Sequence, residues 1–222
     1  MNIFSTSQYL IGRGIPEEIL ILLLMLPIVA TIIAFARQVI GIKGFDIYTP
    51  LIITFAFLLT GLRYGLILFA LILVVGTISR LIVKKFRLLY LPRMAIILTS
   101  VSTIVLLSFY LNNYFNLIKF NIPSVFIVLA MIALIEKFIV IQIERGIRGS
   151  ILLAVEITIL SIISFYVISW GWLENIVLTY PLLIIALTVA INLFLGKWTG
   201  LRLTEYFRFK DVIKNVELPG KK

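Results

Sequence analysis

Residues 94–118 read MAIILTSVSTIVLLSFYLNNYFNLI, a run of 25 residues that contains no charged side chain. An α-helix needs about 20 mostly apolar residues to cross a bilayer, so this stretch is long enough to span one. The composition agrees, because 62% of the 222 residues are hydrophobic and 14% are charged. Soluble domains are about 45–50% apolar and about 25% charged. The sequence therefore predicts an all-α integral membrane protein.

Six further apolar stretches accompany this run, which predicts a seven-transmembrane helix bundle. The second stretch is the weakest, because its 16 residues rise only about 24 Å as a helix. It either spans the bilayer by borrowing flanking residues or forms a re-entrant segment. We expect the seven helices at residues 17–36, 46–61, 64–83, 94–113, 122–143, 150–170 and 176–196.

The distribution of cations between the predicted loops gives the orientation. Of the 20 Lys and Arg residues, 17 fall on one side of the helices, and Arg13, Arg63 and Lys119 fall on the other. Cytoplasmic loops carry the excess of positive charge. We therefore expect the N-terminus outside and the C-terminus in the cytoplasm of a bacterial inner membrane. The net charge of +10 then reports membrane orientation, not nucleic-acid binding.

The predicted organisation is one membrane domain between two tails. Residues 1–16 form a short external tail, residues 17–196 the seven-helix domain, and residues 197–222 a basic cytoplasmic tail. Within the second tail, residues 201–216 mix apolar and basic side chains. That pattern is typical of an interfacial helix on the anionic lipids of the cytoplasmic leaflet. The alternative is that this tail docks a cytoplasmic protein.

Several kinds of active site are excluded by composition. Cysteine and histidine are both absent, which removes thiol catalysis, Cys/His zinc sites, His-ligated haem and imidazole bases. The two aspartates, Asp46 and Asp211, lie near or beyond helix ends and cannot form an intramembrane aspartyl pair. A phosphate-cradling glycine loop is also missing. We expect a protein that is not an enzyme and holds no cofactor or metal.

Three charged residues lie well inside the predicted helices, where charges are costly and usually functional. They are Glu136, Lys137 and Glu156. The fifth and sixth helices are antiparallel neighbours, so the two carboxylates should lie at similar depth, with Arg80 as a further partner. Lys137 sits about 100° round the helix from Glu136 and cannot pair with it directly. The carboxylates either share a proton or clamp a polar ligand with Arg80, or they form a structural ion pair.

Hydroxyl side chains recur at helical spacing in the sixth predicted helix. Thr158, Ser161 and Ser164 begin a stripe that Ile168 interrupts. A pore lining would require the stripe to continue, whereas small hydroxyl residues also line helix contacts. We expect these three side chains to pack against a neighbouring helix.

Three ordered segments resemble one known family, the bacterial seven-transmembrane domain that is usually fused behind an inactive transglutaminase-like domain. They read PIVATIIAFARQVIG from Pro27 to Gly41, LLYLPR from Leu88 to Arg93, and GKWTGLRLTE from Gly196 to Glu205. Between them, Ile135-Glu136-Lys137 is similar to the family's Ile-Glu-Arg. A lysine at the last position lacks the two-pronged hydrogen bonding of a guanidinium.

The resemblance implies a membrane module and no particular reaction. Family members often occur beside ATP-grasp proteins similar to peptide ligases, which implies a peptide-tagging or envelope system. The 222 residues contain no transglutaminase-like domain. We therefore expect the chain either to act alone or to meet such a domain as a separate chain.

The sequence favours a non-enzymatic scaffold or receptor-like module that engages a cytoplasmic protein or an anionic ligand. The alternative is a small-molecule carrier or substrate-binding membrane subunit with a polar site near Glu136 and Glu156. Motif residues and charges together give the candidate polar or partner site: Arg37, Gln38, Arg80, Arg93, Glu136, Lys137, Glu156, Arg202 and Glu205.

Overall fold

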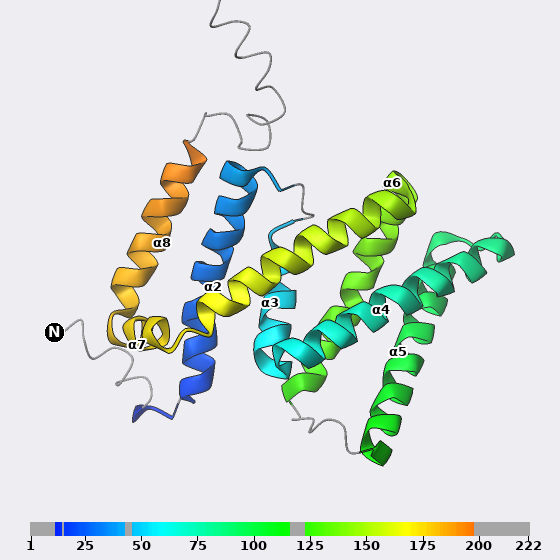
Figure 1. Cartoon of the computed structure of the whole chain (residues 1–222), viewed down its shortest axis with the longest axis horizontal. Coiled ribbons are helices and arrows are strands. Elements are labelled where there is room, and N and C mark those ends of the chain that lie inside the picture. Colours follow the sequence, from blue (N-terminus) through cyan, green and yellow to red (C-terminus); the bar gives the residue numbers. More distant parts are fainter. Residues whose placement is uncertain (1–11, 15, 43–45, 116–122, 198–222) are drawn as a thin grey trace, which may run out of the picture. The chain divides into compact units, whose positions relative to one another are not determined.

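The computed structural model describes residues 12–14, 16–42, 46–115 and 123–197. Within these ranges the regular structure is helical and contains no strand. The chain divides into two compact units, one of Met1–Ile47 with Tyr166–Lys222 and one of Tyr48–Phe165. Figure 1 labels the helices of both units, which are described separately below.

The first unit is built on helix α2, Glu17–Phe35, which continues as a π-helical turn over Ala36–Ile40. Helix α8, Pro181–Gly196, packs along α2 (Figure 1). A polar contact joins the two, because the Asn192 side-chain amide donates to the Thr31 hydroxyl at 2.7 Å. Hydrogen bonds between membrane helices of this kind are worth roughly 0.6–2 kcal/mol.

A sharp bend separates α8 from the short helix α7, Gly171–Thr179. The two helices are inclined by 105° at the break. Tyr180, the residue between them, has φ −126° and ψ 57°, because the ring of the following proline excludes the helical region for the residue before it. The predicted helix 176–196 was therefore wrong in its first turn, which belongs to α7.

The second unit holds α3 (Tyr48–Thr60), α4 (Leu62–Val83), α5 (Tyr90–Phe115) and most of α6 (Pro123–Ile168). Gly61 joins α3 to α4 with φ 82°, a backbone conformation that L side chains rarely adopt. A Cβ on Gly65 would press against the ring of Phe57. Glycine at both positions therefore permits a tight turn with the two helices in contact.

Helix α6 is 46 residues long, roughly twice the length that one crossing requires. It bends sharply at Gly146, as Figure 1 shows. The φ of 73° and ψ of 176° at Gly146 lie in a region open essentially to glycine alone. The predicted helices 122–143 and 150–170 leave a loop between them. The structure shows that this prediction was wrong, because the helix is broken at one residue, Gly146.

The remaining helices lie close to the predicted ranges. Among the described residues, four helical stretches are long and apolar enough to cross a membrane, and the bent pair α7 and α8 makes a fifth when counted as one span. Helix α3 has 13 residues and reaches about 20 Å, in agreement with the weakness expected of the second helix. The four stretches are Glu17–Ile40, Leu62–Phe86, Tyr90–Leu111 and Val128–Ile168.

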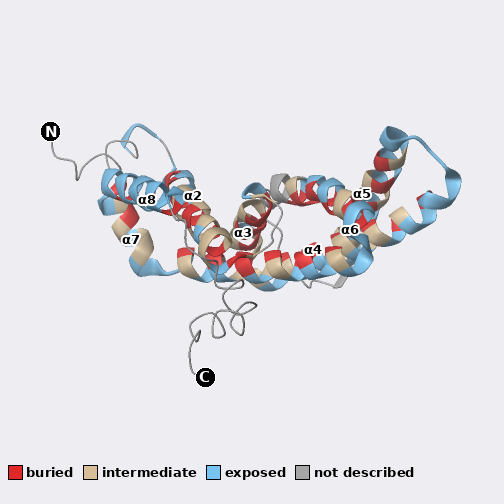
Figure 2. Ribbon diagram, turned by 90° about the horizontal axis from the view of Figure 1, so that it is seen from above, coloured by how far each residue is buried: buried red, intermediate tan, exposed pale blue. Residues whose placement is uncertain are grey.

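Burial is confined to one side of most helices, as Figure 2 shows. Large apolar side chains are exposed elsewhere, for example Leu183 and Phe194 on α8 and Val74 on α4. Such a surface is costly in water but matches the hydrocarbon of a bilayer. In the second unit, α4 and α6 approach closely at Gly76, where a Cβ would collide with the buried side chain of Ile135.

Candidate functional site

One turn beyond Gly76, a chain of hydrogen bonds joins α4 to α6. Arg80 donates from Nη1 to the Gln142 Oε1 at 2.9 Å. Gln142 donates in turn from Nε2 to the Thr77 hydroxyl at 2.7 Å, and that hydroxyl donates to the Leu73 carbonyl at 2.8 Å. Only 2% of Gln142 is exposed. A buried neutral amide therefore fixes the position of the Arg80 guanidinium.

A second group of polar side chains lies at the start of α5. The Tyr90 hydroxyl donates to the Glu136 Oε1 at 3.0 Å, which links α5 to α6. The Arg93 guanidinium carbon lies 5.9 Å from the centre of the Tyr90 ring, within the range of a cation–π contact. Arg93 is also close enough to Arg80 for their positive charges to repel each other. The polar site thus consists of Arg80 on α4 with its partner Gln142, Tyr90 and Arg93 on α5, and Glu136 on α6.

The two other charges predicted inside helices, Lys137 and Glu156, have different surroundings. The Lys137 ammonium is 6.0 Å from the centre of the Tyr48 ring, a cation–π contact with α3. Glu156 is half-buried, and its Oε2 is buried without a hydrogen-bond partner among the described residues. The hydrogen bond of Arg80 goes to Gln142 and to neither glutamate. The part of the chain that the structure describes holds no cluster of three or more metal-ligating side chains.

The remaining predicted site residues belong to the other unit or lie outside the described ranges. Arg37 and Gln38 are half-buried in the π-helical turn of the first unit. Arg202 and Glu205, with the whole predicted interfacial helix, lie outside the described residues. The structure therefore brings together Arg80, Arg93 and Glu136 of the predicted set.

Of the three hydroxyl residues in α6 after Gly146, Ser161 contacts a neighbouring helix, as expected. Ser161 and Ser164 are fully buried, and the Ser161 hydroxyl donates to the Pro50 carbonyl of α3 at 3.1 Å. Thr158 donates to its own helix, at the Ala154 carbonyl. The Ser161 contact is typical of a helix interface, whereas the Ser164 hydroxyl is buried without a hydrogen-bond partner among the described residues.

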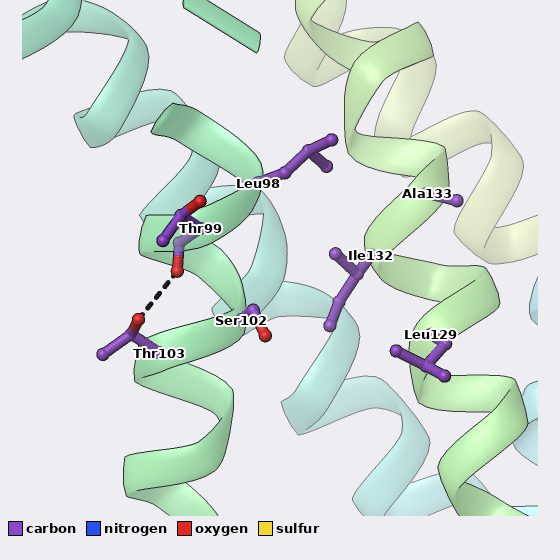
Figure 3. A pocket seen from close by; sticks show the side chains of 7 residues that line it. All are labelled: Leu98, Thr99, Ser102, Thr103, Leu129, Ile132 and Ala133. Atoms are coloured by element: carbon purple, nitrogen blue, oxygen red, sulfur yellow. Dashed lines mark hydrogen bonds between the residues drawn. The ribbon is translucent and has the colours of Figure 1, made fainter. Parts of the chain in front are cut away.

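A groove of about 420 Å³ lies between α5 and the first arm of α6. Figure 3 shows its mixture of apolar and hydroxyl side chains. The hydroxyls of Thr99 and Thr103 donate to carbonyls of their own helix, at 2.8 Å each, so they need no ligand. Neither glutamate lines the groove, whose lining consists of Leu98, Thr99, Ser102, Thr103, Leu129, Ile132 and Ala133.

Three members of the polar site were missed by sequence reasoning: Gln142, Thr77 and Tyr90. Gln142 interrupts an otherwise apolar run near the end of the predicted fifth helix. An uncharged amide inside a predicted span is itself a signal, because it must find a partner within the protein. Tyr90 belongs to the LLYLPR segment. Its partner on α6, Glu136, could not be identified from the sequence, because the contact forms only in the tertiary structure.

Together these features define a multi-pass, all-helical membrane protein with a polar site of mixed charge. The sequence model of one family, described as seven transmembrane helices usually fused to an inactive transglutaminase, matches residues 15–213. The chain belongs to this family, as the motifs from Pro27 to Glu205 predicted. No curated protein and no solved structure matches the chain.

Proposed function

We propose that the protein is a non-enzymatic scaffold or receptor-like module that engages a cytoplasmic protein or an anionic ligand through the polar site. The observation that carries this proposal is the hydrogen bond of Arg80 to a buried neutral amide. A carboxylate partner would cancel the charge of Arg80, whereas Gln142 holds the guanidinium in place and leaves its charge available. Arg93 adds a second positive charge beside it.

The proposed topology has seven crossings, with the N-terminus outside and the C-terminus in the cytoplasm of a bacterial inner membrane. The length of α6 and its bend at Gly146 support two crossings by its two arms. With α2, α3, α4, α5 and the bent α7–α8 pair, the total is seven. In this arrangement the polar site faces the cytoplasm, on the side that carries 17 of the 20 cations.

The absence of enzymatic activity is part of the proposal. The family's usual fusion partner is an inactive transglutaminase, which supports a role in binding. The proposed partners are therefore anionic lipids of the cytoplasmic leaflet, a cytoplasmic protein of a peptide-ligase or envelope system, and a transglutaminase-like domain on a separate chain.

Reversal of one charge at the site should remove a cytoplasmic protein partner. In pull-downs from membranes that contain the full chain, we expect Arg93→Glu to capture roughly tenfold less of any specific partner, because one attraction becomes a repulsion. Arg63→Glu is the matched control, since Arg63 is an exposed cation at the opposite end of α4. Equal capture by wild type and both variants would count against a protein partner at this site.

Cysteine labelling tests the proposed topology without background, because the natural chain has no cysteine. Three exposed cations give the reporter sites Arg63→Cys, Lys85→Cys and Arg148→Cys. A maleimide that cannot cross membranes should label Arg63→Cys in intact cells. The other two variants should react only after the cells are permeabilised. Labelling of Lys85→Cys in intact cells would contradict the orientation.

The alternative function, a small-molecule carrier or substrate-binding subunit, is favoured by one observation. Glu156 holds a buried carboxylate oxygen without a partner in the described part of the chain, and such a group is costly unless a ligand or proton satisfies it. A cationic small molecule that raises the melting temperature of wild type but not of Glu156→Gln would support this function. Glu144→Gln, which removes an exposed carboxylate, is the control, and an equal loss in both variants would argue against a site at Glu156.

A further inference from the structure

The turn between α4 and α5 exposes cations and large apolar side chains together. Lys84, Lys85 and Arg87 are all exposed. Among them, Phe86 is 66% exposed, and Leu89 is 80% exposed. Arg87 has φ 47°, the one positive φ of a non-glycine residue among those described, and it ends the 3₁₀ turn over Lys84–Phe86 that continues α4. The basic turn, residues 84–91, is thus a surface of mixed chemistry rather than a simple charged loop.

Neither water nor hydrocarbon suits this mixture. Three cations are costly in the hydrocarbon core. Exposing phenylalanine and leucine side chains to water also costs free energy. The headgroup layer of an anionic leaflet accommodates both, because apolar side chains reach the acyl chains while cations meet phosphates. The composition of the basic turn therefore fits the surface of a membrane that contains anionic lipid.

The two arginines of the polar site stand at the two ends of this turn. Arg80 is one helical turn before Lys84, and Arg93 is one helical turn after Leu89. The Nε of Arg93 is buried and has no hydrogen-bond partner among the described residues. A buried donor without a partner is costly, and a phosphate oxygen is the acceptor that a guanidinium fork matches best.

We propose that Arg80, Arg93 and the basic turn bind the phosphate group of an anionic phospholipid. This inference rests on the proposed function and names the anionic ligand of its site. Soluble phosphate would pair with the arginines only and would leave the exposed Phe86 and Leu89 without a role. A phospholipid accounts for both features, because its phosphate meets the guanidinium groups while its acyl chains lie against the apolar side chains.

The test measures lipid binding to the full chain purified in a neutral detergent. The probes are dioleoylphosphatidylglycerol, dioleoylphosphatidylcholine and inorganic phosphate, each titrated against the melting temperature, with bound lipid counted by native mass spectrometry. We expect phosphatidylglycerol alone to stabilise the protein and remain bound. Arg93→Gln should weaken its apparent affinity about tenfold, as expected for one lost charge-assisted contact.

Two further variants keep the test decisive. Arg145→Gln removes an exposed cation near the bend of α6 and should leave the affinity unchanged. Leu89→Ser removes an apolar side chain of the basic turn, and it should weaken the binding of phosphatidylglycerol because the acyl chains lose a contact. If Arg93→Gln does not fold, weaker binding of phosphatidylglycerol by Leu89→Ser tests the proposal instead.

Equal stabilisation by phosphatidylcholine, or an equal loss in Arg145→Gln, would overturn the proposed site. If inorganic phosphate stabilises the protein and Arg93→Gln abolishes this effect, the ligand is a soluble anion, and the assignment of a phospholipid is overturned. Failure of all three probes would overturn this inference alone, because the protein pull-down tests the proposed function separately.

Discussion

The hydrogen bond between Arg80 and Gln142 is the interaction on which the second unit's polar site depends. A membrane supplies no water to satisfy polar groups, so each one must find its partner within the protein. Gln142 meets this constraint with both ends of its amide, accepting from Arg80 and donating to Thr77. The close approach of α4 and α6 at Gly76 brings these side chains within reach. The small size of Gly76 lets the two helices approach, and the hydrogen bonds of Gln142 then hold them together.

The same arrangement explains how positive charge is kept at one place. A lone arginine in a span tends to be neutralised by a carboxylate, yet here the nearby carboxylate of Glu136 accepts from Tyr90. Arg93 then lies over the Tyr90 ring and is close enough to Arg80 for their positive charges to repel each other. The result is a pair of guanidinium groups whose positions are set by neutral side chains. Such a pair suits an anion from outside the chain better than an internal salt bridge.

The sequence was sufficient to predict where most helices lie, because apolar runs of this length have few alternatives to spanning a bilayer. It also predicted a helix contact for Thr158, Ser161 and Ser164, and the structure confirms this for Ser161, which donates to α3. Family membership followed from ordered motifs rather than from physical reasoning, and the matched region, residues 15–213, agrees with it.

Two features could not be read from the pattern of apolar residues. The bend at Gly146 replaces a loop, because one glycine at positive φ redirects the chain while the charged residues on either side of it stay helical. Likewise, Gln142 was overlooked as the partner of Arg80, since charge suggested Glu136 or Glu156. Hydropathy reports which residues enter the membrane, but it carries no information on which side chains face each other across two helices.

A double-mutant cycle between Arg80 and Gln142 tests the central claim most directly. Unfolding free energies would be measured for the full chain in detergent with Arg80→Met, Gln142→Leu and both changes together. If the amide holds the guanidinium in place, the two effects should be coupled by about 0.6–2 kcal/mol, the range found for hydrogen bonds between membrane helices. Additive effects, with a coupling near zero, would contradict the claim that Gln142 positions Arg80.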